Sequence, residues 1–268
     1  MDFTLLLLYF PMGALVGFIA GLLGVGGGAI LVPAFLVAAQ AENFPPEHAM
    51  HMALGTSLAC ILASSFSSAR THLKKGAVQI GVVKGMGPAI FVGSLAGAFL
   101  AARLPAAPLK WLFLSFLVYV AQDLLRKPKP VAHATLPGPR GLAWMGALIG
   151  GFSSLVGIGG ASLTVAFLVW CSVGMHEAIG TSAALGVVIA LAGTIGYVVN
   201  GWGIDHLPYG SLGFVYLPAF VGVTLTSYFV APYGARAAHR LPVLTLRRVF
   251  ALFLLVVSLR MAAAQLGW

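Results

Sequence analysis

Charged residues are scarce in this chain of 268 residues. Only 8% of them are Asp, Glu, Lys or Arg, whereas soluble domains carry about 25%, and 60% are hydrophobic. A surface in contact with water cannot be built from so few charges, so most of the exterior must face lipid. Because one membrane helix needs about 20 apolar residues, the chain has room for about eight of them.

Cysteine and acidic residues are also few, which limits the chemistry of the chain. Cys60 and Cys171 lie in apolar segments and form no CxxC pair, so we expect packing residues and neither a disulfide nor a metal site. No catalytic residue, metal or cofactor is expected. The 15 basic residues fall mostly in short loops, which indicates orientation in a membrane and not nucleic-acid binding. The start, Met-Asp-Phe-Thr, carries no positive side chain and is not typical of a cleaved signal peptide.

The chain contains an internal repeat. Residues 12–33 align without gaps on residues 145–166, with ten of the 22 positions identical. Further matches follow in the same order: residues 53–57 with 178–182, Gly76 with Gly201, and Pro88-Ala89 with Pro218-Ala219. We therefore expect a first transmembrane repeat over 1–125, a cytoplasmic linker rich in Pro and basic residues over 126–140, and a second transmembrane repeat over 141–268.

The first apolar segment of each repeat is too long for one membrane span and is interrupted by glycines. Residues 3–41 carry no charged side chain, and they are broken at Gly24-Val25-Gly26-Gly27-Gly28. Residues 141–175 are broken in the same way at Gly157-Ile158-Gly159-Gly160. Since each Gly costs a helix about 1 kcal/mol, both segments are predicted to form a helix, a break and a short returning half-helix.

The distribution of basic residues decides how the two repeats are oriented. If the broken segments return to the side from which they start, the basic clusters near 74–75, 126–140 and 236–248 all lie on one side of the membrane. If each segment crosses fully, the clusters lie on opposite sides. The positive-inside rule favours the first arrangement, which predicts an all-α polytopic membrane protein of two homologous, inverted repeats with glycine-broken first helices.

The glycine breaks are the first candidate binding site. The half-helix after each break begins near Gly28 or Ala161, and its free N–H groups and positive dipole end favour an anion. The alternative is close helix packing through small residues. Because two equivalent breaks occur, we predict substrate binding by the glycines of both: Gly24, Gly26, Gly27, Gly28, Gly157, Gly159 and Gly160.

Two Thr-Ser pairs, Thr56-Ser57 and Thr181-Ser182, lie near the starts of the next helices and form a second candidate. Their hydroxyl groups can donate to an oxyanion without bringing a neutralising charge. They can equally bond back to their own helix turn. We predict that they join the backbone N–H groups of the breaks in holding the anion.

Four ionisable residues lie within or beside the apolar segments. Arg70 and His72 close the second segment, while His51 and His176 each stand four residues before a Gly-Thr-Ser motif. They are candidates for proton coupling or gating. The alternatives are extension to the membrane interface for Arg70 and interfacial capping for the two histidines.

These motifs resemble those of the TauE/SafE sulfite exporter family. The resemblance rests on Gly21-Leu22-Leu23-Gly24-Val25-Gly26-Gly27-Gly28 with Val32-Pro33, on Gly55-Thr56-Ser57-Leu58, and on residues 72–78, His-Leu-Lys-Lys-Gly-Ala-Val. It implies a permease of the bacterial inner membrane for sulfite, sulfonates or related organosulfur anions. The second copy departs from the pattern, with Ala161 and Ala166 in place of a glycine and a proline.

The expected function is therefore transport of a small anion. A passive anion channel would share the same sequence features. A membrane-embedded hydrolase would need a nucleophile with a base, and the serines near Arg70 and His72 are accompanied by no Gly-x-Ser-x-Gly elbow. The expected partners are a small anionic substrate and the lipid bilayer, and the sequence leaves open whether copies of the chain form a homo-oligomer.

Overall fold

The protein is all-helical apart from one short hairpin in the part of the chain that the structure describes. The computed structural model describes residues 3–23, 27–125, 135–238 and 243–265. Its elements are α1 (Phe3–Leu23), α2 (Gly28–Ala41), α3 (Pro46–Lys74), α4 (Ile80–Arg103), α5 (Ala106–Leu125), α6 (Pro139–Val156), α7 (Ala161–Trp170), α8 (Met175–Gly201), β1 (Ser211–Leu212), β2 (Val215–Tyr216), α9 (Leu217–Ala238) and α10 (Val243–Gln265).

The outer surfaces of the helices are apolar, as the composition predicts for contact with lipid. Val92 of α4 is 66% exposed and Val256 of α10 is 62% exposed. Among the described residues, α3, α4, α5 and α8 are long and apolar enough to cross a membrane, and shorter apolar helices accompany them. The protein is a multi-pass membrane protein.

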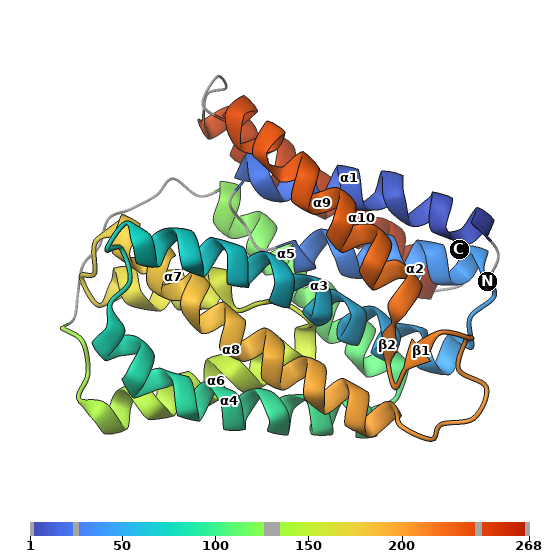
Figure 1. Ribbon diagram of the computed structural model, residues 1–268, viewed down its shortest axis with the longest axis horizontal. Helices are drawn as coiled ribbons and strands as arrows, with labels where there is room; N and C mark the ends of the chain where they lie inside the picture. The colour runs from blue at the N-terminus through green and yellow to red at the C-terminus, as the bar shows by residue number, and fades with distance from the viewer. Residues whose placement is uncertain (1–2, 24–26, 126–134, 239–242, 266–268) are drawn as a thin grey trace.

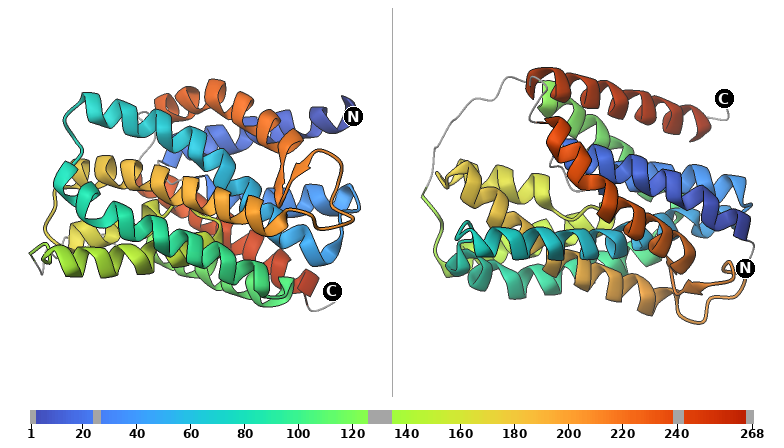
Figure 2. Two further views of the ribbon diagram at one scale, coloured as in Figure 1. Left: turned by 60° about the horizontal axis from the view of Figure 1, so that its bottom comes forward. Right: turned by 45° about the horizontal axis from the view of Figure 1, so that its top comes forward.

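The helices of the two halves run in opposite directions. In Figure 1, α1 runs towards one end of the molecule and α6 towards the other, and the same opposition holds for α3 with α8 and α4 with α9. Both views of Figure 2 show the start of α1 and the end of α10 at the same end of the molecule. Helix α6 begins at the opposite end (Figure 1). An inverted arrangement requires this placement.

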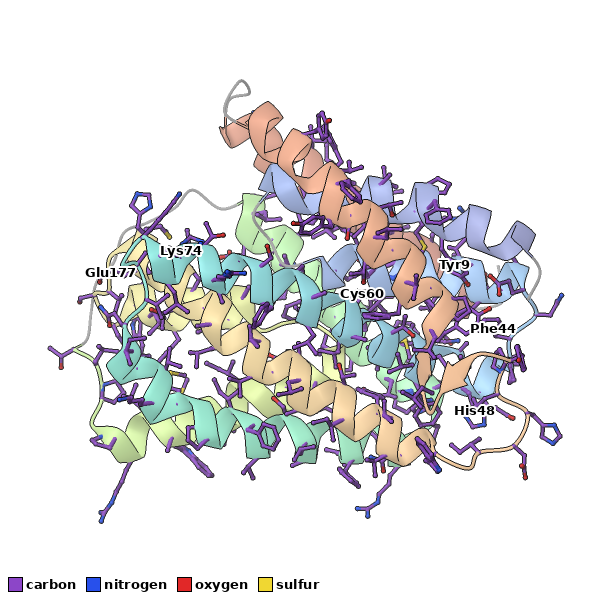
Figure 3. All side chains as sticks on the ribbon, viewed as in Figure 1. Tyr9, Phe44, His48, Cys60, Lys74 and Glu177 are labelled. Atoms are coloured by element: carbon purple, nitrogen blue, oxygen red, sulfur yellow. The ribbon has the colours of Figure 1, made fainter. Side chains whose placement is uncertain are left out.

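We name the two ends of the molecule by their side chains. Figure 3 shows Tyr9, Phe44 and His48 at one end, which we call the aromatic end. Lys74 and Glu177 lie at the other, which we call the basic end because Lys74 and Lys75 are both exposed there.

The two halves exchange helices at their packing surfaces. Helix α1 packs along α9, and α6 packs along α4. A Cβ atom built on Gly13 of α1 would come within 2.6 Å of the Cα atom of Val223 in α9, and one built on Gly97 of α4 would come within 2.2 Å of the carbonyl oxygen of Gly151 in α6. Only glycine permits such close approach. Two related halves would produce this exchange. The division of the chain into repeats over 1–125 and 141–268 stays a prediction.

Candidate functional site

Each predicted break separates a long helix from a short one. Helix α6 ends at Val156, and Gly157 and Gly160 both adopt left-handed backbone conformations with φ of 67° before α7 begins. In the first half, α1 ends at Leu23 and α2 begins at Gly28. The predicted site residues Gly24 and Gly26 lie outside the described residues. Because left-handed φ favours glycine, these two glycines determine where the second break occurs.

The two breaks meet in the buried interior. A Cβ atom on Gly28 would come within 2.8 Å of the carbonyl oxygen of Gly157 and 3.1 Å of the Cα atom of Ile158. Gly27, Gly28, Gly159 and Gly160 are all buried. The start of α2 is therefore in direct contact with the loop that leads into α7. From this contact the two short helices run to opposite ends of the molecule (Figure 1).

The short helices begin without help from side chains. Gly27 precedes α2 and Gly160 precedes α7, and neither helix start has a side-chain capping bond in the described part of the chain. The first N–H groups of an α-helix have no acceptor within the helix. Two helix N-termini that are buried, neighbouring and uncapped by side chains make a region of positive potential, which suits an anion.

Both predicted serines contact the backbone of the second break. The Ser57 hydroxyl of α3 donates to the carbonyl oxygen of Gly157 at 3.0 Å, and the Ser182 hydroxyl of α8 donates to that of Ala161 at 3.3 Å. In this conformation their protons are directed at carbonyl oxygens and not into an anion site. The two serines therefore hold α3 to the second break and α8 to the start of α7.

Removal of the Ser57 hydroxyl should destabilise the second break. The Ser57→Ala variant loses a buried hydrogen bond of the kind that contributes about 1 kcal/mol, so its apparent Tm in detergent should fall. Ser64→Ala is the matched control on the same helix, because that hydroxyl donates only to Ile61 of its own helix. Equal Tm values for the two variants would show that the Ser57 bond does not hold the break.

The predicted threonines hold the turns that precede α4 and α9. Thr56 accepts the backbone N–H of Tyr216 at 2.9 Å, and Thr181 accepts that of Gln79 at 2.9 Å. Each turn also lies against the glycine before its threonine. A Cβ on Gly55 would come 2.9 Å from the carbonyl oxygen of Phe214, and one on Gly180 would come 2.2 Å from that of Ala77. We call these two contacts the threonine clasps.

The clasps lie at opposite ends of the α3–α8 pair, and neither threonine hydroxyl donates to an acceptor within the described residues. Each hydroxyl uses an oxygen lone pair to accept an N–H, and a hydroxyl group can still donate. The threonines therefore remain candidates for anion binding. Their clasping role was not among the alternatives that the sequence suggested.

The ionisable candidates lie towards the two ends of the molecule. His51 is buried, and its Nε2 lies 3.2 Å from the carbonyl oxygen of Ala101 and 3.0 Å from that of Leu104, so it donates to the C-terminal end of α4. This is the capping arrangement. Arg70 and His176 are exposed, and His72 lies in the last turn of α3, towards the basic end. These four residues are not gathered around the breaks.

Two clusters of polar side chains in the structure were not predicted from the sequence. At the aromatic end, Tyr9 donates to one carboxylate oxygen of Glu42 at 2.5 Å and Tyr216 donates to the other at 3.3 Å. Around the second break, the hydroxyls of Ser153, Ser154 and Thr164 are buried and have no hydrogen-bond partner within the described residues. Their position directly beside the predicted glycine break is the signal that could have found them.

Comparison with known proteins places the chain in a transporter family. The model of the family described as sulfite exporter TauE/SafE matches residues 9–261. The chain belongs to this family. It is 37% identical over 262 residues to a protein of Haemophilus influenzae named as a probable membrane transporter protein, a match that covers 97% of this chain and 98% of that protein.

More distant relatives carry similar names. The probable membrane transporter protein YdhB of Bacillus subtilis is 30% identical over 200 residues, covering 72% of this chain and 78% of that protein. YunE of the same organism is 24% identical over 226 residues, covering 75% and 80%. No solved structure matches the chain. Membership of the family makes this protein a membrane transporter and supports a function other than catalysis.

Proposed function

We propose that the protein transports a small sulfur-containing oxyanion, sulfite or a sulfonate, across the bacterial inner membrane. The observation that carries this proposal is the contact between Gly28 and the Gly157-Ile158 loop. It brings the N-termini of two short helices together in the interior. Discontinuous helices that meet inside a bundle are a recurring way to bind substrates in transporters.

Neutral donors suit a transported anion better than fixed cations do. An Arg or Lys in a low-dielectric site would bind an anion strongly and slow its release. Backbone N–H groups and hydroxyls give hydrogen bonds of about 1 kcal/mol each, and more when the acceptor is charged. Several such bonds can replace the water of the anion and still allow it to leave. The donors we propose at this contact are the backbone N–H groups of Gly27, Gly28, Gly159 and Gly160.

The charge of the two ends suggests the orientation. Lys74, Lys75 and Arg140 are exposed at or near the basic end, whereas Glu42 lies at the aromatic end. The positive-inside rule then puts the basic end in the cytoplasm. There the lysines would raise the local concentration of anions at the entrance.

The proposal is tested by flux measurements with purified protein in proteoliposomes. Labelled sulfite should enter in a saturable way, and unlabelled methanesulfonate, thiosulfate and sulfate should compete to different extents. Accumulation against the anion gradient would identify a transporter and exclude the channel. Flux no greater than that of empty liposomes for all four anions would refute the proposal.

The double variant Thr56→Val/Thr181→Val tests the hydroxyl donors. It keeps the shape of both side chains. Because the two threonines lie at opposite ends of the α3–α8 pair, only one of them can bond a small anion at a time, and loss of that bond to a charged acceptor should weaken apparent affinity by about tenfold. The variant Thr56→Ser/Thr181→Ser retains both hydroxyls and should keep most of the affinity. Because the valines also remove the threonine clasps, the Tm of each variant is measured alongside. Unchanged affinity in a folded valine variant would remove the threonines from the site.

A further inference from the structure

An apolar groove opens on the side of the molecule between α5 and α6. It has a volume of about 470 Å3, and it is lined by Leu112, Ser115 and Tyr119 of α5 and by Leu148 and Ile149 of α6. These residues lie in the middle of their helices, at the depth of the hydrocarbon core if α5 spans the membrane. Leu148 is 52% exposed and Tyr119 is 54% exposed, so the groove is open to the bilayer.

The inner end of this groove borders the second break. Phe116, Phe152 and Leu163 line the groove, and the same three residues line a smaller inner pocket together with Ser153, Gly160 and Ser162. The rings of Phe116 and Phe152 have centroids 5.8 Å apart and separate the two spaces. The inner pocket has no room for a water molecule in this conformation. A ligand would therefore need these rings to part.

The inner pocket contains a hydroxyl group that is available to donate to an anion. The Ser153 side chain is 1% exposed, and its hydroxyl has no hydrogen-bond partner in the described ranges. It is directed at the start of α7, since a Cβ on Gly160 would come within 3.0 Å of its oxygen. Buried polar groups normally find a partner, so a hydroxyl group without one beside a helix N-terminus is available to donate to an anion bound there.

These hydroxyls belong to the second half alone. In the alignment of the repeats, Ser153 and Ser162 correspond to Ala20 and Ala29. Close packing at a break does not require hydroxyls, because the first half has none at these positions. The hydroxyl groups therefore indicate a function that is specific to the pocket beside α7.

We propose that the site takes an amphiphilic anion, an alkyl sulfonate, which enters from the bilayer with its alkyl chain in the groove and its sulfonate group at Ser153, Ser162 and the start of α7. This deepens the proposed function and rests on it. The groove extends from Leu112 to Tyr119, about 10 Å along α5. An alkyl chain of medium length fits this distance. The groove then buries the alkyl chain, while the polar pocket binds the sulfonate group.

The test is competition by methanesulfonate, butanesulfonate and octanesulfonate against labelled sulfite in proteoliposomes. In the wild-type protein the inhibition constant should fall with chain length, by up to about fourfold for each methylene that enters the groove. Leu148→Trp fills the groove and should abolish this dependence on chain length. Val92→Trp is the matched control, because Val92 is 66% exposed on α4 and does not line the groove.

A second variant tests the position of the sulfonate group. Ser153→Ala removes no existing hydrogen bond, so it should fold, and it should weaken all three sulfonates by the same factor. The proposal is overturned if Leu148→Trp keeps the wild-type dependence of the inhibition constant on chain length. A lower Tm with unchanged inhibition constants would indicate that the groove holds a lipid, and it would overturn the proposal as well. It is also overturned if Ser153→Ala changes nothing. Absence of sulfite flux in the wild-type protein would instead refute the proposed function.

Discussion

Gly28→Ala should lower anion flux strongly, because it adds a methyl group where the two breaks touch. The new Cβ atom would lie 2.8 Å from the carbonyl oxygen of Gly157 and 3.1 Å from the Cα atom of Ile158. Both neighbours are backbone atoms and cannot rotate away, so the two breaks must separate. A strain of about 1–3 kcal/mol in the loaded state corresponds to roughly 5- to 150-fold weaker binding.

The control for this variant is a Gly→Ala substitution at a position where the added methyl group contacts no other atom. A Cβ on Gly81 of α4 would meet nothing within 4 Å, so Gly81→Ala should transport like the wild-type protein. Sulfite uptake is measured for both variants at matched amounts of folded protein. Wild-type uptake and affinity in Gly28→Ala would mean that contact between the breaks is not needed for transport.

Gly97→Ala should cause a large loss of stability. Its Cβ atom would lie 2.2 Å from the carbonyl oxygen of Gly151 and 2.9 Å from the Cα atom of that residue, where α4 packs on α6. The two helices would have to move apart along their whole contact. Overpacking of this kind costs about 1–3 kcal/mol and occasionally more.

Gly87 on the same helix gives the control for this measurement. It is buried, yet a Cβ atom built there meets nothing within 4 Å. Gly87→Ala should therefore keep the wild-type Tm in detergent, while Gly97→Ala should unfold at a clearly lower temperature. Indistinguishable Tm values for the two variants would contradict the close packing of α4 on α6.

The positions of the breaks could be predicted from the sequence because they depend on local backbone preferences. Gly157 and Gly160 adopt left-handed conformations that few other residues accept, and such requirements are visible in a single chain. The scarcity of charges likewise predicts a membrane protein by itself. Both signals depend on composition and on near neighbours, and neither requires knowledge of the packing.

The roles of individual polar residues could not be predicted, because they depend on contacts between distant segments. Thr56 accepts a hydrogen bond from the backbone N–H of Tyr216, which is 160 positions away in the chain. The sequence alignment paired Gly76 with Gly201. In the structure Gly76 lies three residues before Gln79, and Gly213 lies three residues before Tyr216. Both glycines have positive φ, and the N–H groups of Gln79 and Tyr216 are the ones that the two threonines accept. The loops have different lengths in the two halves, so the alignment alone could not find this correspondence.

The exchange of helices between the halves has a consequence for how the chain enters the membrane. Helix α1 is made before the other described helices, whereas its packing partner α9 is made after α8. During synthesis the glycine-lined surface of α1 therefore has only lipid, or a chaperone, beside it until most of the chain has been inserted. Helix α6 differs, because α4 is already present when it emerges. The second half can thus assemble on a finished surface, and the final closure of the molecule waits for α9.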